Sequence, residues 1–438
     1  MPERELCDPA MVIWVLDLEL QEKRKLKKEF FIGNRKKMYD MLPEGSLFAV
    51  FSGREIIKTN DEYYSFFADR NFVYLTGLTC KEAILFARKD GDGSVHETLY
   101  LLPPDDYAER WTGVRIKPAE AEEISGISDI RSSGEFIKDF RKDAWSGNYG
   151  KLYLDLYKAD DSDIDRAQHD FKHYVHHNLP FMSFGNSDPL FRKLRLYKQP
   201  CEIDALRTAE KITGEGILAM MKHSKPGMRE FMYKVEFDRA IHEYAPYIYG
   251  FPPIISAGKG NFIIHNYSYT GQANDGDMVL NDVGVMWDFL INDVSRSWPC
   301  NGKFSDRQKL LYECALKTSD YMFSIVKPGM RMDAVDKTIR EYNAELLVDA
   351  GVLDDVSNIG KYMWHGGAHH IGFDVHDVVE TPEFIAPDMV FCIDVGIYHE
   401  EWGIGFRLED NCLITEDGCE NLSAGIPRTI EDIEALMR

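Results

Sequence analysis

The sequence predicts an α/β protein of two units, the second of which is built from two similar halves. Three observations carry this prediction: the length of 438 residues, an alternation of helix and strand patterns from Phe30 onward, and an internal repeat that begins at Lys225. A chain this long exceeds what one hydrophobic core usually organises, so two domains are expected. The hydrophobic content of 44% and charged content of 28% are typical of a globular protein.

The composition excludes several classes of function. The formal net charge is −22, and an acidic surface repels phosphate backbones, so nucleic acid is not expected as a partner. The charge is explained most simply by solubility, although part of the carboxylate excess could be ligands whose charge a bound cation offsets. The eight cysteines have irregular spacing without a CxxC pair, which indicates reduced thiols in a cytoplasmic protein. No apolar run reaches the roughly 18 residues that span a bilayer, so no membrane association is expected.

The first domain is expected at residues 29–190, after an N-terminal extension at residues 1–28 to which the sequence assigns no role. The pattern predicts a helix at 34–42, a turn at 90–93 and a mostly helical segment at 104–145. Strands are predicted at 46–51, 71–75, 83–87, 98–102 and 151–156.

The second domain, residues 191–438, opens with a helical segment at 193–221 and contains the repeat. The sequence Lys-Pro-Gly-Met-Arg at 225–229 recurs at 327–331, 102 residues later, each time between apolar helical patterns. A second echo pairs Asp282-Val-Gly with Asp394-Val-Gly in the same order. Similar turn chemistry around Pro-Gly is the alternative explanation. Two echoes in one order favour duplicated halves related by a pseudo-twofold axis.

The first half places two aspartates in a predicted hairpin. Asp282 and Asp293 are equidistant from a turn near Trp287-Asp288, so we expect them to face each other across two strands. Opposed carboxylates on a buried face are costly unless a divalent cation lies between them. The alternative is a pair of surface aspartates at the end of a loop. The apolar residues around both positions favour a buried sheet.

The second half offers a matching pair. Strands are predicted at 391–398 and 405–415, joined at 400–403, so that Asp394 and Glu409 can pair across this hairpin. Four carboxylates that converge on a pseudo-twofold axis would be hard to explain without metal.

Histidines supply the remaining candidates. His365, His369, His370 and His376 fall within twelve residues, and the glycines among them predict a loop that enters a strand. A surface histidine loop is the alternative. His265 lies alone in an apolar segment at 262–266 that reads as a strand, where a histidine is more often a core residue than a ligand.

This set of side chains indicates a class of metal. One imidazole and four carboxylates suit Mn²⁺, Co²⁺, Zn²⁺ or Fe²⁺, whereas calcium coordination by oxygen atoms would not need histidine. Two such ions roughly 3.5 Å apart can share a hydroxide, which is a nucleophile at neutral pH.

These residues resemble a known family. The order Asp282, Asp293, His369, an acid at 394 and Glu409 is similar to the five-ligand signature of the pita-bread metallopeptidases. The segments 292–299, 301–304, 365–369 and 372–377 resemble the aminopeptidase P and prolidase branch, and 71–77 and 109–113 resemble its first domain. The resemblance covers roughly residues 29–438.

The resemblance implies a pita-bread catalytic domain with an internal pseudo-twofold, preceded by a smaller α/β domain. It implies that Asp282 and Asp293 hold one metal, that Asp293 and Glu409 bridge to the second, and that His369 and the acid at 394 complete it. The positions of His265, His365 and His376 match histidines that line the proline-side pocket and contact the reacting groups. Arg407 and Tyr398 match positions near the metals.

The implied function is hydrolysis of the N-terminal Xaa-Pro bond of peptides by a hydroxide shared between two metals. Mn²⁺ is the first choice of metal, and Co²⁺, Zn²⁺ or Fe²⁺ are alternatives. The implied partners are peptides with proline at position 2 and further copies of the chain, in a homodimer or higher oligomer. A dipeptidase of the prolidase type is the alternative within the enzyme class.

Asp394 departs from the family pattern, which has glutamate at this position. Aspartate is one methylene shorter, so its carboxylate falls short by about 1.5 Å, and misplacement of that size can cost on the order of 10²-fold in rate. Shifted strands could restore the geometry, water could fill the gap, or the enzyme could be slow or dead. A metal-free binding protein of the same fold is therefore the alternative from a different class.

Overall fold

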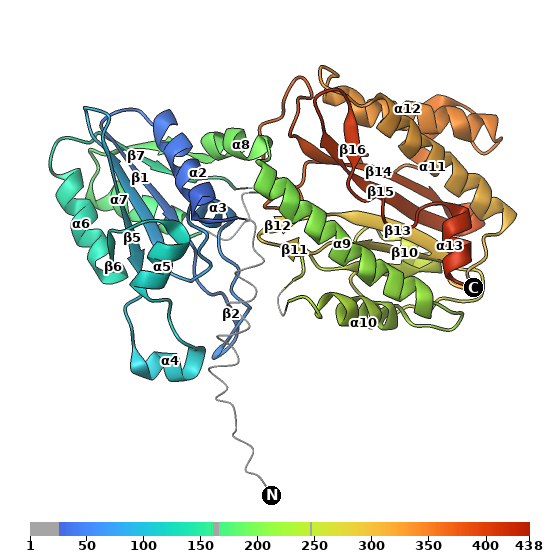
Figure 1. Ribbon diagram of the computed structural model, residues 1–438, viewed down its shortest axis with the longest axis horizontal. Helices are drawn as coiled ribbons and strands as arrows, with labels where there is room; N and C mark the ends of the chain where they lie inside the picture. Colours follow the sequence, from blue (N-terminus) through green and yellow to red (C-terminus); the bar gives the residue numbers. More distant parts are fainter. Residues whose placement is uncertain (1–25, 159, 161–165, 246–247) are drawn as a thin grey trace, which may run out of the picture. The chain divides into compact units, whose positions relative to one another are not determined.

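The computed structural model describes residues 26–158, 160, 166–245 and 248–438 (Figure 1). These residues form two compact units, Leu26–Leu196 and Tyr197–Arg438. The domain boundary expected at 190/191 lies inside α8, the last helix of the first unit. The predicted extension at 1–28 lies outside the described residues as far as residue 25.

The first unit is a six-stranded mixed sheet with helices. The strand order is β6-β5-β4-β1-β7-β8, with β4 antiparallel to both β1 and β5 and the other neighbours parallel. Its strands are β1 (Ser46–Phe51), β4 (Ile84–Lys89), β5 (Val95–Leu101), β6 (Ile130–Ser132), β7 (Lys151–Leu154) and β8 (Ser183–Asn186), and β2 (Ile57–Thr59) and β3 (Glu62–Tyr63) form a separate hairpin. Its helices are α2 (Lys28–Met41), α3 (Arg70–Thr76), α4 (Asp106–Thr112), α5 (Pro118–Ser125), α6 (Phe136–Ala144), α7 (Ala167–Asn178) and α8 (Asp188–Leu196).

The structure confirms the helix predicted at 34–42 and four of the five predicted strands of this unit. The strand predicted at 71–75 is wrong, because this segment forms α3. The Asp69 side chain caps the helix by accepting from the backbone N–H groups of Asn71 and Phe72 at 3.0 and 3.1 Å. All seven residues of α3 are buried, and a short segment that is buried on every side lacks the periodicity that distinguishes a helix from a strand.

The second unit repeats one order of elements. In Figure 1 the helices α9 and α10 (green) and α11 and α12 (orange) flank its strands. The helices are α9 (Pro200–His223), α10 (Glu230–Ile241), α11 (Asp306–Ile325), α12 (Asp333–Asp349) and α13 (Ile430–Leu436). One three-stranded sheet has the order β13-β10-β9, another has the order β14-β15-β16, and β11 and β12 form a separate pair. The strands are β9 (Ile254–Ala257), β10 (Met278–Val283), β11 (Met286–Trp287), β12 (Leu290–Ile291), β13 (Val294–Pro299), β14 (Val390–His399), β15 (Ile404–Ile414) and β16 (Cys419–Asn421).

The sequence repeat corresponds to a structural repeat. Gly227 and Gly329 each follow the proline of a Lys-Pro-Gly-Met-Arg copy and adopt positive φ angles of 86° and 85°, which glycine permits. The N–H of Gly227 donates to the Ala273 carbonyl at 2.7 Å, and that of Gly329 donates to the Ile385 carbonyl at 2.8 Å. Each copy therefore ties the turn between two helices to the segment before a long strand, β10 in the first half and β14 in the second, as expected of duplicated halves.

The continuous helix expected at 193–221 is broken. It ends at Leu196 and restarts at Pro200, because proline lacks an N–H and favours the first turn of a helix. Gln199 before it is extended, with φ −76° and ψ 157°.

The register predicted for the first hairpin is wrong by two residues. Asp282 pairs with Ser295, and not with Asp293. The turn lies at Asp288-Phe289, whose φ angles of 50° and 74° are both positive, as in a type I′ turn. A shift of two residues preserves the face of the sheet because side chains alternate with period two. In the other half the predicted pairing of Asp394 with Glu409 is confirmed.

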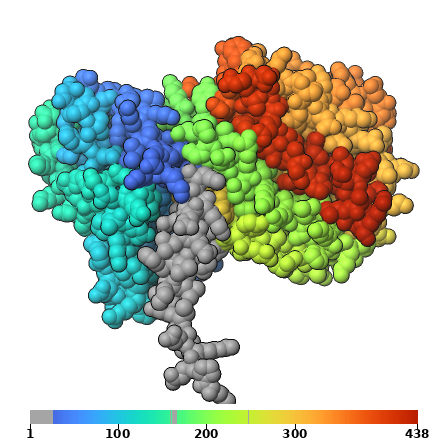
Figure 2. All heavy atoms as spheres, in the orientation of Figure 1, coloured from blue at the N-terminus to red at the C-terminus, as the bar shows by residue number. Residues whose placement is uncertain are grey.

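A buried ion pair lies beneath the C-terminal segment, which Figure 2 shows in red on the surface of the second unit. Arg296 donates to Asp410 at 2.6 Å, and both side chains are fully buried. Arg296 also donates to the Glu409 carbonyl at 2.7 Å and to the Pro427 carbonyl at 3.1 Å. This one guanidinium thus joins β13, β15 and the C-terminal segment.

In the described part of the chain, no helix combines the length and the apolar composition needed to cross a bilayer.

Glu210 on α9 lies close to the buried Arg296–Asp410 ion pair. Burial raises the pKa of the Glu210 carboxyl to about 8 from 4.5. The folded state therefore retains a proton that the unfolded state loses, so stability falls as pH rises from about 4.5 towards 8. We expect Glu210→Gln, which resembles the protonated acid, to raise the melting temperature at pH 8 by roughly 2–4 °C per kcal/mol recovered. The difference from the wild type should nearly vanish at about pH 5. Equal melting temperatures at both pH values, measured by calorimetry, would contradict this assignment.

Candidate metal centre

Side chains from the two sheets of the second unit meet at one place. Ser295 on β13 donates through Oγ to Glu409 Oε2 on β15 at 2.9 Å. Arg407 on β15 donates through Nη2 to Asp282 Oδ2 on β10 at 2.8 Å. The hydroxyl of Ser297 donates to the Arg407 carbonyl at 3.1 Å. These contacts hold carboxylates from both halves of the repeat beside one another.

Asp293 lies between β12 and β13, and its backbone is held by the Asn411 amide. The N–H of Asp293 donates to Asn411 Oδ1 at 3.1 Å, and Asn411 Nδ2 donates back to the Asp293 carbonyl. A paired amide of this kind satisfies a buried peptide outside a strand. Asn411 therefore fixes the backbone from which the Asp293 carboxylate projects.

His369 reaches the same place from the histidine loop, residues 365–377. The predicted strand is absent here. Instead the loop runs along the edge of β14, where Asp394 donates through its N–H to the Gly367 carbonyl at 2.9 Å and Cys392 to the His369 carbonyl at 2.8 Å. His369 Nε2 lies 3.3 Å from Glu409 Oε1 and 3.6 Å from Asp293 Oδ2.

Four side chains lie close enough together to hold one metal ion. One ligand atom each from Asp293, His369, Cys392 and Glu409 lies within 4.8 Å of all the others. The side chains of Asp293, Cys392 and Glu409 are buried, and that of His369 is half-buried. Cys392 on β14 was not among the predicted site residues. We call this group the metal cluster.

The charges of the cluster are unbalanced. Burial, followed by the carboxylates of Glu409 and Asp282, raises the pKa of Asp293 well above its ordinary value. One oxygen each of Asp282, Asp293 and Asp394 is buried and has no hydrogen-bond partner within the described residues. Glu409 Oε1 is also buried, with His369 Nε2 at 3.3 Å as its polar neighbour. Buried carboxylate oxygens without partners are costly, and a divalent cation would satisfy them. The residues therefore fit a metal.

Asp394 faces Glu409 directly across β14 and β15, but it is not a member of the metal cluster. Its Oδ2 lies 3.2 Å from His365 Nδ1. Burial lowers the pKa of His365, but the Asp394 carboxylate outweighs burial, so the net shift is upward. Asp394 thus has the His365 imidazole as a close polar neighbour.

The second contact of His365 is with Tyr398. Its Nε2 lies 2.9 Å from the Tyr398 hydroxyl, which also accepts from Arg407 Nη1 at 3.2 Å. A Cβ at Gly396 would collide with the His365 ring, so the glycine admits this histidine. Burial opposes the charge of Arg407, but Asp282 together with Tyr398, Asp394 and Glu409 outweighs burial, so the pKa of the guanidinium is raised. Tyr398 and Arg407 therefore connect His365 to Asp282.

The other two predicted histidines lie at the outer side of the cluster. The ring of His376 packs against that of His369 with centroids 4.4 Å apart. Partial burial, then His369 and more weakly His265, lower the pKa of His376. The strand predicted around His265 is wrong. The residue follows the 3₁₀ helix η2 (Gly258–Phe262) in a turn, with its ring exposed and stacked on Tyr267.

Sequence reasoning missed three residues that shape this centre: Ser295, Cys392 and Asn411. The signal was present in the alternation of the strands. Cys392 and Asn411 each lie two positions from a predicted ligand, so they share its face of the hairpin. A polar residue two positions from a ligand on a buried strand was therefore a candidate.

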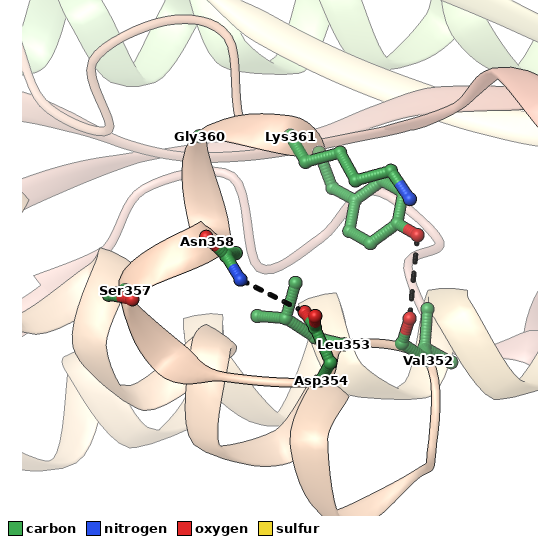
Figure 3. A pocket seen from close by; sticks show the side chains of 8 residues that line it. Val352, Leu353, Asp354, Ser357, Asn358, Gly360 and Lys361 are labelled. Carbon is green, nitrogen blue, oxygen red and sulfur yellow. Dashed lines mark hydrogen bonds between the residues drawn. The ribbon is translucent and has the colours of Figure 1, made fainter.

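A surface hollow of about 610 Å³ lies elsewhere in the second unit (Figure 3). It is lined by residues between Val352 and Tyr362, and Asn358 donates to Asp354 at 3.1 Å beside it. None of the predicted site residues lines it.

Comparison with known proteins identifies relatives of both units. Residues 204–416 match the model of metallopeptidase family M24, and residues 31–153 match the aminopeptidase P N-terminal domain. The Xaa-Pro aminopeptidase of Haemophilus influenzae is 30% identical over 96% of this chain and 100% of the relative. Human Xaa-Pro aminopeptidase 3 is 26% identical over 88% of this chain and 80% of its own length.

Solved structures agree with the sequence comparison. A Bacillus anthracis structure provisionally described as an aminopeptidase P matches with a TM-score of 0.92 at 33% identity, and covers 94% of this chain and 99% of its own. Aminopeptidase P from Escherichia coli with the inhibitor Pro-Leu matches with a TM-score of 0.87 at 26% identity, and covers 94% and 98%.

The two hydrogen bonds between the Asn411 amide and the Asp293 peptide, here called the Asn411 clamp, can be removed by mutation. Asn411→Leu removes both bonds to the buried Asp293 peptide, at a cost of about 1–3 kcal/mol for each unsatisfied group. We expect the variant to unfold at a lower temperature and to lose most of the stabilisation that added Mn²⁺ gives the wild type, measured by thermal shift. Asn343 on α12 is equally buried, so Asn343→Leu is the control: it should destabilise but keep the response to Mn²⁺. An undiminished response in Asn411→Leu would refute the clamp.

Proposed function

The chain belongs to metallopeptidase family M24, in its aminopeptidase P branch, and from that membership we propose that it removes the N-terminal residue of peptides with proline at position 2. It is a metallo-aminopeptidase. The observation that carries the proposal is the set of buried carboxylate oxygens without partners around His369. The relatives named Xaa-Pro aminopeptidase support the substrate class.

We propose Asp282, Asp293, His369, Asp394 and Glu409 as the residues that hold two divalent ions. Mn²⁺ is the first candidate because four of the five donors are carboxylates, and Co²⁺, Zn²⁺ and Fe²⁺ are the alternatives. When bound, the ions supply Lewis acidity and a water activated as nucleophile at neutral pH. Asp282 is oriented by Arg407 and Glu409 by Ser295, and such supporting bonds commonly strengthen metal affinity.

The histidines around the cluster are proposed to handle the substrate. His376 lies beside His369, where a donor can stabilise the oxygen that gains charge in the transition state. Asp394 and His365 are 3.2 Å apart and form a pair that can pass a proton towards the leaving nitrogen. His265 and Tyr398 are proposed to line the pocket for proline. Arg407 transfers no proton in this scheme. Its hydrogen bonds keep Asp282 and Tyr398 in place.

The match to an aminopeptidase P N-terminal domain favours an aminopeptidase over a prolidase-type dipeptidase. A cytoplasmic location and assembly into a homodimer or larger oligomer complete the proposal. The shorter acid at 394 favours reduced activity, and in the extreme a binding protein of the same fold.

Activity on defined peptides tests the substrate class. We expect Mn²⁺-loaded protein to cleave Xaa-Pro-Xaa tripeptides, to leave the same tripeptides with alanine at position 2 intact, and to act weakly on Xaa-Pro dipeptides. Asp293→Asn should lower kcat/KM by at least about 10²-fold, because it removes charge from the centre of the cluster. Asp349→Asn, at an exposed position on α12, should have no effect. Intact tripeptides and dipeptides with every metal tried would refute the proposal.

Restoring the longer acid tests the role of Asp394. Asp394→Glu extends the carboxylate by about 1.5 Å, and we expect it to raise kcat by up to about 10²-fold if misplacement limits the reaction. The peptidase assay should be run with metal content measured on the same samples. Unchanged kcat at equal metal content would show that the site works with the shorter acid.

A further inference from the structure

We propose that the thiol of Cys392 is a ligand at the metal position formed by Asp293, His369 and Glu409. A sulfur ligand makes this position favour a thiophilic divalent ion such as Zn²⁺ over Mn²⁺. The inference rests on the proposed metal centre and specifies the chemistry of one of its two positions.

The strand geometry directs the thiol to the cluster. Cys392 lies on β14 two residues before Asp394, so both side chains point to one face. Cys392 pairs with Asn411 and Asp394 with Glu409, which makes Cys392 and Glu409 diagonal neighbours across the hairpin. Diagonal partners are within reach of each other on a sheet face. Cys392 is fully buried, so its thiol does not contact bulk solvent in this structure.

The distances favour Cys392 over Asp394, two residues further along β14, as a ligand at this position. The sulfur lies within 4.8 Å of the ligand atoms of Asp293, His369 and Glu409, whereas Asp394 is not part of this group. The Asp394 carboxylate instead lies 3.2 Å from His365. The thiol at 392 therefore belongs to the group at this metal position, and the shorter acid at 394 does not.

The surroundings of the thiol are those of a supported ligand. Asn411 Nδ2 lies 3.4 Å from Cys392 Sγ, and this amide also holds the Asp293 peptide. The backbone N–H of Cys392 donates to the His369 carbonyl at 2.8 Å. Cys392 is thus tied to two other members of the cluster, through its side chain and through its backbone. Partners that orient a ligand in this way raise metal affinity.

The chemistry of the ligand determines which ion this metal position prefers. Thiolate is a soft ligand that selects zinc and other thiophilic metals, whereas carboxylate ligands suit Mn²⁺. Without a cation, burial and the Glu409 carboxylate raise the pKa of the Cys392 thiol. When the sulfur–metal bond forms, the thiol proton passes to solvent and the cation balances the negative charges. The position beside Asp282 has only carboxylates from Asp282 and Asp293, so the two positions should differ in their preferred ion.

The test uses full-length protein loaded with Co²⁺, because a cobalt–thiolate bond produces a near-ultraviolet charge-transfer band that oxygen and nitrogen ligands do not. We expect the band in the wild type and its loss in Cys392→Ser. In competition titrations, the preference for Zn²⁺ over Mn²⁺ at one position should fall about 10- to 100-fold in that variant. Cys412→Ser is the matched control: Cys412 on β15 is equally buried and is not a member of the cluster. It should keep both the band and the preference.

Cys392→Thr preserves a side chain suited to a strand and replaces the serine variant if the latter does not fold. Bound Co²⁺ without the band in the wild type, or with the band retained in a folded Cys392 variant, overturns the inference and leaves the proposed peptidase intact. Failure of the wild type to bind Co²⁺, Zn²⁺ or Mn²⁺ overturns the metal centre and the inference together. Metal content by mass spectrometry separates these outcomes.

Discussion

The main constraint on the second unit is the repulsion among carboxylates that its sheets bury close together. Asp282, Asp293 and Glu409 approach one another from β10, from the segment before β13 and from β15. Without a counter-charge, burying them would cost several kcal/mol per ion. The oxygens that face no donor are those a cation would contact. The fold therefore carries an electrostatic strain that metal binding relieves.

Specific donors hold these three acidic residues in place. Ser295 holds Glu409, Arg407 holds Asp282, and Asn411 holds the peptide of Asp293. Each donor lies on a strand, so each is positioned by the sheet hydrogen bonds and not by its own side-chain freedom. Catalytic constellations need this kind of support, because small displacements of a ligand cost large factors in rate. The buried Arg296–Asp410 pair extends the support to the C-terminal segment.

The two halves of the repeat have kept one framework and diverged at the centre. The matching turns at Gly227 and Gly329 make the same backbone contacts. The two halves bring different chemistry to the centre, since the first half brings carboxylates and the second also brings the imidazole of His369 and the thiol of Cys392. Asp282 and Asp394 correspond in the repeat, yet one contacts arginine and the other histidine. Duplication thus provides a symmetric scaffold on which the side chains of each half can change separately.

The sequence by itself determined the kinds of side chain at the centre, the repeat, most strands, and the pairing of Asp394 with Glu409. The residues that join β14 and β15 lie symmetrically about a short connection, so counting from it places the two acids opposite each other. The same counting failed for Asp282 and Asp293, because positive φ angles at Asp288 and Phe289 moved the turn by one residue. It also failed for α3, where burial on every side removed the periodicity that separates helix from strand.

Only the tertiary structure decided which side chains from distant strands share one space. The presence of Cys392 in the cluster, the Asn411 clamp and the exposed turn of His265 follow from how two sheets and a loop pack together. Local patterns specify the period and face of a strand, whereas the neighbours of that face come from segments more than a hundred residues away, as Ser295 and Glu409 illustrate. A sequence therefore names candidate ligands, and the packing of the sheets selects among them.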